Sequence, residues 1–69
     1  MQLSARNVLP GKVIDITQGA VNVEVIIEIA PGVEIASIIT KQACEHLQLK
    51  KGMSAYAAIK ASNVMIAVD

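Results

Sequence analysis

Hydrophobic and polar positions alternate along much of this chain. The clearest alternation runs from Ala20 to Ile29, where one parity holds only β-branched residues: Val21, Val23, Val25, Ile27 and Ile29. The other parity carries Asn22, Glu24 and Glu28, interrupted by Ile26. In a strand, successive side chains point to opposite faces, so a period of two marks one apolar and one polar face. The pattern therefore predicts a strand with one buried face over residues 20–29.

The neighbouring stretches predict two hairpins around this strand. Residues 11–16 form a run of β-favouring residues that ends at a turn, Thr17-Gln18-Gly19. Residues 33–39 alternate again, directly after Pro31-Gly32, a pair typical of tight turns. Three strands joined by two hairpin turns are thus expected in the first forty residues.

The alternation is lost after residue 39. Residues 41–47 are good helix formers and follow Thr40, a candidate N-cap, so we expect a helix of about two turns there. Gly52 ends the segment that follows the helix. Alternation then returns over residues 53–60, and residues 63–68 predict a last strand.

This order of elements predicts an all-β fold in a single domain, residues 1–69. Three strands, one short helix and two more strands fit a five-stranded barrel of the oligonucleotide/oligosaccharide-binding (OB) type, with the helix between strands 3 and 4. An open sheet is the competing architecture, but it would leave long apolar edges exposed.

Length and composition favour an assembly of several identical chains. At 69 residues, a single core rarely supplies more than about 3–5 kcal/mol, so small proteins usually add disulfides, a structural metal or oligomerisation. One cysteine excludes an intrachain disulfide, and together with one histidine it is too little for a zinc site within the chain. The chain is also 54% hydrophobic, and Ile26 on the polar face suits a strand partly covered by another subunit.

Several other classes of protein fit poorly. No apolar run approaches the roughly 18–20 residues of a spanning helix, and the first six residues do not resemble a secretory signal, so we expect a cytoplasmic protein without a membrane partner. Six cations balance six acidic residues, and Tyr56 alone makes no stacking platform, which argues against nucleic acid as a partner.

Catalysis is not expected either. His46 is the single imidazole and has no acidic cluster around it in sequence, so we interpret it as a surface or interface residue. Cys44 has no evident basic neighbour to activate its thiol, and we interpret it as a small buried hydrophobe. We expect no metal site and no catalytic residues.

Three short segments carry hydrogen-bond donors. Ser4 to Asn7 holds a hydroxyl, the single guanidinium of the chain and an amide, and Lys60 to Asn63 holds an ammonium, a hydroxyl and an amide. The turn at Gly19-Ala20 can present backbone N–H groups. These segments are compatible with ordinary polar turns. They also suit a site for a tetrahedral oxyanion, which needs N–H and O–H donors with some positive charge, most easily assembled where chains meet.

In these segments the chain resembles the molbindins, small molybdate-binding proteins made of a Mop domain and related to TOBE modules. The resemblance covers essentially the whole chain and is carried, in order, by Ser-Ala-Arg-Asn at 4–7, Leu-Pro-Gly-Lys-Val at 9–13, Gly-Ala-Val at 19–21, Val-Glu-Val at 23–25, Ser-Ile-Ile-Thr at 37–40 and Ala-Ile-Lys-Ala-Ser-Asn-Val-Met at 58–65.

The resemblance implies a five-stranded OB-like barrel in a hexamer, a trimer of dimers, that holds molybdate or tungstate in pockets between subunits. It implies oxyanion ligands from two segments, Ser4, Ala5, Arg6, Asn7, Lys60, Ala61 and Ser62. A second class of pocket, near a threefold axis, would use Gly19, Ala20 and Val21. Arg6 would either contact the anion or form an ion pair that positions its loop.

The function implied is reversible storage of molybdenum as its oxyanion, with no cofactor and no metal bound in other form. An OB-type nucleic-acid-binding module and a purely structural homo-oligomer are the alternatives.

Overall fold

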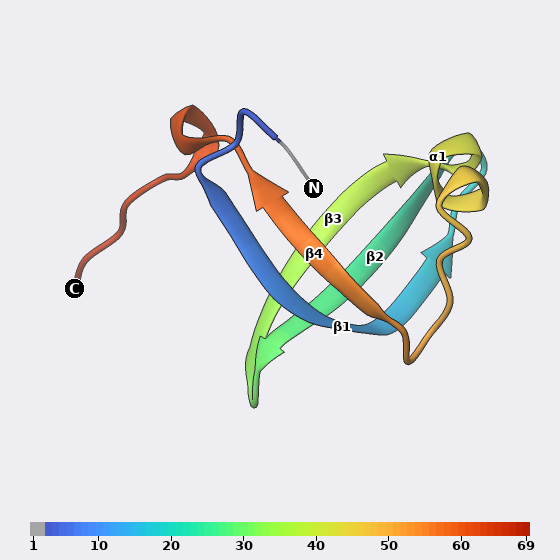
Figure 1. Ribbon diagram of the computed structural model, residues 1–69, viewed down its shortest axis with the longest axis horizontal. Helices are drawn as coiled ribbons and strands as arrows, with labels where there is room; N and C mark the ends of the chain where they lie inside the picture. The colour runs from blue at the N-terminus through green and yellow to red at the C-terminus, as the bar shows by residue number, and fades with distance from the viewer. Residues whose placement is uncertain (1–2) are drawn as a thin grey trace.

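The computed structural model describes residues 3–69 and is built around one antiparallel sheet (Figure 1). Its elements, in chain order, are β1 (Asn7–Gln18), β2 (Asn22–Ala30), β3 (Val33–Thr40), α1 (Lys41–His46), β4 (Ser54–Ile59) and a 3₁₀ turn, η1 (Ala61–Asn63). The strands follow the order β3-β2-β1-β4 across the sheet, so β3 and β4 are its two edges. The mostly β class and the helix between β3 and β4 are confirmed.

The alternation in β2 places its apolar parity in the core as expected. Val23, Val25 and Ile27 are buried, and they pack with Val13 of β1 and Ala57 of β4. Val21 shares their parity but is exposed, because it lies in the turn that precedes β2. The Pro31-Gly32 turn joins β2 to β3, and Gly32 adopts a φ of +78° that favours glycine.

Strand β1 bends sharply and pairs with two different strands (Figure 1). Its first half, residues 7–12, runs antiparallel to β4, and its second half, residues 12–18, runs antiparallel to β2. Gly11 lies at the changeover, where a Cβ atom would be 2.6 Å from the carbonyl oxygen of Glu28. The bend therefore requires glycine at this position, because a larger residue would push β1 away from β2. A register shift between Val13 and Asp15 adds to the curvature.

The short helix predicted after Thr40 is present as α1 and lies at one end of the sheet (Figure 1). The Oγ1 atom of Thr40 accepts a hydrogen bond of 3.0 Å from the backbone N–H of Ala43, which is the expected N-cap. Cys44 is buried in the core, whereas His46 is exposed. The turn after the helix is held against β1, because Gly52 N–H donates to the carbonyl of Val13 at 2.7 Å.

The predicted fifth strand is wrong for the single chain. After β4 the chain makes the 3₁₀ turn η1, and residues 64–69 run away from the sheet without pairing to it (Figure 1). The chain therefore forms a half-barrel of four strands, and not the closed five-stranded barrel expected. The alternation over residues 63–68 correctly indicated an extended segment. A strand, however, also needs the edge of a neighbouring strand to pair with, and η1 directs this segment away from the sheet of its own chain (Figure 1).

Within residues 3–69 no helix is long and apolar enough to cross a membrane.

The bend in β1 makes a prediction about stability. Gly11→Ala should lower the free energy of unfolding by about 1–3 kcal/mol, because its new Cβ would overlap backbone that cannot move aside independently. Urea unfolding at a fixed chain concentration measures the change. Lys12→Ala, at the neighbouring exposed position, is the control and should cost much less. An unchanged midpoint for Gly11→Ala would contradict this account of the bend.

Candidate functional site

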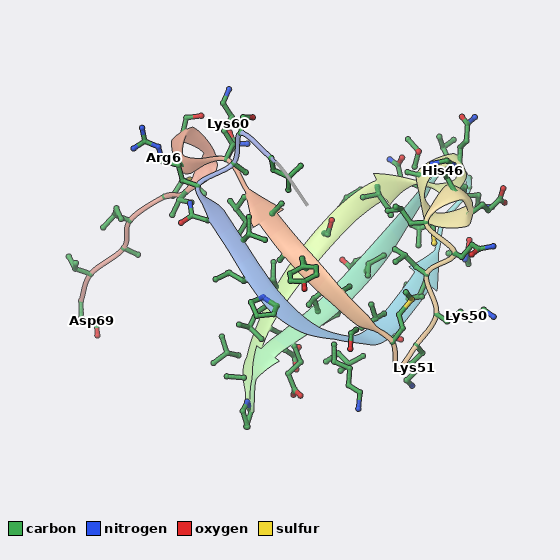
Figure 2. All side chains as sticks on the ribbon, in the orientation of Figure 1. Arg6, His46, Lys50, Lys51, Lys60 and Asp69 are labelled. Atoms are coloured by element: carbon green, nitrogen blue, oxygen red, sulfur yellow. The ribbon has the colours of Figure 1, made fainter. Side chains whose placement is uncertain are left out.

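Two of the three donor segments meet at one corner of the sheet. Ser4 to Arg6 lead into β1, and Lys60 to Ser62 follow β4. Because β1 and β4 are antiparallel, with Asn7 opposite Ile59, the start of one strand lies beside the end of the other. Figure 2 shows Arg6 and Lys60 together at this end of the molecule, with His46, Lys50 and Lys51 at the far side. We call residues 4–7 and 60–63 the donor corner.

A side-chain hydrogen bond ties the two segments of the donor corner together. The Nδ2 atom of Asn7 donates to the backbone carbonyl of Ile59 over 3.2 Å, in a partly buried position. At least one N–H of this amide is thus engaged within the chain. The sequence motif suggested Asn7 only as a ligand, and it missed this positioning contact, because the contact follows from the β1–β4 register rather than from local sequence.

The turn η1 shapes the other half of the donor corner. The N–H of Asn63 donates to the carbonyl of Lys60 at 2.8 Å, and that of Val64 donates to Ala61 at 3.3 Å. Ser4, Arg6, Lys60, Ala61 and Ser62 are exposed, and Ala5 is half-buried. In a single chain these donors therefore face solvent. An anion bound here would be enclosed only if another part of the assembly covered the donor corner.

The donor corner is positively charged although the chain is neutral overall. No Asp or Glu occurs between residues 3 and 14 or between residues 46 and 68, the two stretches that contain it. Arg6 and Lys60 are therefore not offset by a carboxylate within either segment. Charges separated by more than about 8–10 Å are largely screened at physiological salt, so local composition matters more than net charge for an ion at this corner.

The third segment lies elsewhere. The turn Gly19-Ala20-Val21 follows the opposite end of β1 and sits beside α1, where Lys41 N–H donates to the carbonyl of Val21 at 3.1 Å. The N–H of Gly19 donates to Asn22 at 2.8 Å and is engaged within the turn. Within one chain the structure does not bring this turn to the donor corner. Any shared site would combine segments from different copies.

The groups at the donor corner suit an anion rather than a metal cation. They are hydroxyls, amides, a guanidinium and an ammonium, which donate hydrogen bonds, whereas metal cations need lone pairs from carboxylates, thiolates or imidazoles. Among residues 3–69, no group of three or more His, Cys, Asp or Glu side chains is placed to hold a metal ion.

Comparison with known proteins places the whole chain in one family. The model of the TOBE domain matches residues 3–66. Molybdenum-pterin-binding protein 1 of Clostridium pasteurianum is 46% identical over 66 residues, which cover 96% of this chain and 97% of that protein. A probable molybdenum-pterin-binding protein of Haemophilus influenzae is 45% identical over 69 residues, the full length of both.

Solved structures agree with the sequence comparison. A molybdate-binding protein from Sporomusa ovata superposes with a TM-score of 0.90 at 28% identity, covering 99% of this chain and 100% of that one. ModG, a cytoplasmic molybdate-binding protein solved with molybdate bound, gives a TM-score of 0.88 at 54% identity, covering 94% of this chain and 46% of that longer one. This chain belongs to the TOBE-domain family, among its small molybdenum-pterin-binding, or Mop, proteins.

Proposed function

We propose that this protein binds molybdate or tungstate reversibly at subunit interfaces and so stores molybdenum in the cytoplasm, without changing the anion chemically. The donor corner carries the proposal, because β1–β4 pairing brings two cation-bearing segments without carboxylates together. The molybdate bound in the similar ModG structure supports the choice of ligand.

Each residue of the donor corner has a physical role in this proposal. Hydroxyls of Ser4 and Ser62 and backbone amides of Ala5 and Ala61 donate to the oxygens of the anion. Lys60 supplies charge, since a hydrogen bond from a charged donor is roughly twice as strong as a neutral one. Arg6 adds a second charge or fixes its loop, and Asn7 holds the two segments in register.

The free oxyanion is favoured over a pterin cofactor as the ligand at this corner. A pterin presents a flat aromatic ring, which binds well against aromatic side chains. The donor corner contains none, and Tyr56, the single aromatic residue of the chain, lies in the middle of β4. The donors at the corner instead match a small anion with acceptor oxygens on every side.

The assembly proposed is a hexamer, a trimer of dimers, of five-stranded barrels. Its support is that the donor corner is open in a single chain and that the Gly19-Ala20-Val21 turn lies at the other end of β1. Neither segment encloses an ion alone. Contacts between copies complete both classes of site, the second of them around residues 19–21.

The charge at the donor corner is tested by a matched pair of lysine variants. Lys60→Ala should weaken molybdate binding roughly 10- to 100-fold, since a hydrogen bond to a charged group contributes about 1.5–3 kcal/mol. Lys51→Ala removes the same charge from an exposed loop at the far side of the molecule and should leave the affinity unchanged (Figure 2). Titration calorimetry measures both. Equal weakening by the two variants would mean that net charge, not the corner, attracts the anion.

Ligand identity is tested on the unaltered protein. Molybdate at 100 times its dissociation constant should stabilise the folded state by about 2.7 kcal/mol and raise the melting temperature, whereas sulfate at the same concentration should have a much smaller effect. No response to molybdate would refute the proposal and leave a purely structural oligomer. Salt-sensitive retention on single-stranded DNA would instead favour the nucleic-acid-binding alternative.

A further inference from the structure

The connection between α1 and β4 is fastened to β1 by a single turn, residues 50–53. Within the turn, the N–H of Met53 donates to the carbonyl of Lys50 over 3.2 Å, and Gly52 adopts a φ of +95°. The N–H of Gly52 donates to the carbonyl of Val13 at 2.7 Å, and the N–H of Val13 donates to the carbonyl of Met53 at 2.9 Å. Val13 is fully buried and lies at the register shift in β1. The turn therefore grips β1 at a buried residue beside its irregularity.

The sulfur atom of Met53 closes the same turn a second time. The N–H of Lys50 donates to the Sδ atom of Met53 over 3.1 Å. Lys50 and Met53 are thus joined in both directions, by one backbone and one side-chain hydrogen bond. A thioether sulfur is a weak acceptor, so this contact depends on its lone pairs and on its position. The chemical state of one sulfur atom is in this way linked to the shape of the turn.

The Met53 side chain is more accessible than the thiol that shares a cavity with it. Met53 is half-buried and lines two cavities of about 370 and 570 Å³. Cys44 lines the larger cavity as well, but it is only 7% exposed. Each cavity is many times larger than the roughly 30 Å³ of a water molecule, so a small oxidant has room to enter. Since oxidation of sulfur follows exposure and a buried thiol is inert, Met53 is the one of the two that an oxidant modifies.

We propose that Met53 is an oxidation site, modified by hydrogen peroxide, and that its sulfoxide releases the turn at residues 50–53 from β1. A lone pair of Sδ attacks one peroxide oxygen, so that an S–O bond forms and the O–O bond breaks. The departing hydroxide takes up the proton of the transferred oxygen and leaves as water. The sulfur loses two electrons, and the peroxide gains them. This inference does not depend on anion binding and stands or falls separately from the proposed function.

The effect of the oxidation follows from the surroundings of Met53. A sulfoxide turns an apolar side chain into a polar one. Val13 belongs to the core, Leu49 and Ala55 pack against it, and all three line the 370 Å³ cavity together with Met53. A polar oxygen among these apolar side chains lowers the stability of the folded state. Oxidation therefore replaces a side chain that packs on the core and accepts from Lys50 by one that draws the turn toward solvent.

Peroxide treatment of two matched variants tests the assignment. Both carry Met65→Leu, because Met65 is 93% exposed and would react as well. One variant keeps Met53, the other carries Met53→Leu in addition, and Met1 is common to both. Peptide mass spectrometry locates the added oxygen, and thermal unfolding is measured before and after treatment. The variant with Met53 should gain one oxygen there and lose roughly 4–8 °C in melting temperature, whereas the variant with Met53→Leu should keep its untreated melting temperature.

Hydrogen exchange gives a second test, because it shows which part of the molecule opens. In the oxidised variant that keeps Met53, the amide hydrogens of Val13 and Gly52 should exchange several-fold faster, since their bonds join the turn to β1. The amide of Asn63, which donates to Lys60 beyond the other end of β4, is the control and should exchange as before. The proposal is overturned if Met53 gains no oxygen, if it gains one without a loss of melting temperature, if the Met53→Leu variant loses as much, or if exchange rises equally at Asn63.

Discussion

Strand β1 must pair with two partners at once, and the rest of the molecule is arranged around this constraint. Twelve residues long, it contacts β4 along its first half and β2 along its second. The strand bends between these two halves, and the close approach at Gly11 permits the bend (Figure 1). The bend curls a four-stranded sheet into a half-barrel, whose concave side holds Val13, Val23 and Val25.

The donor corner and an apolar opening between β3 and β4 are two consequences of the same geometry. β1 and β4 meet in antiparallel register, so the residues before β1 and after β4 share a corner. Since β1 joins β4 to β2, β3 and β4 are the remaining edges, and residues of both line the opening between them. The turn η1 belongs to both features, because it carries Ser62 next to Lys60 and also sets the direction of residues 64–68. The proposed anion site and the unpaired C-terminal segment are in this way neighbours in the fold.

The charge at the donor corner is set by nearby residues and not by the net charge of the chain. The formal net charge is zero, yet the acidic residues occupy other parts of the chain than the donor corner. In the function proposed above, the corner would attract an anion through a few directed donors and nearby positive charge, and screening by salt limits the influence of the distant carboxylates. The neutral surface as a whole remains compatible with close packing of several copies, because no large field of one sign opposes their association.

The amino-acid sequence alone determined the local structure and the family. The alternation predicted β2, β3 and β4, Thr40 marked the start of α1, and Pro31-Gly32 marked a turn, because side-chain period and capping act within a few residues. The motifs at residues 4–7 and 60–62 indicated the family. Their assignment as ligands stays a prediction.

Only the tertiary structure decided which segments meet. It placed Asn7 opposite Ile59, separated the Gly19-Ala20-Val21 turn from the donor corner, and left residues 64–68 unpaired where a fifth strand was expected. Alternation reports which face of a strand is apolar, but it does not report which edge the strand pairs with. That choice depends on the bend of β1 and on the direction of η1, since strand pairing joins residues far apart in sequence. Asn7 and Ile59, for example, are 52 residues apart.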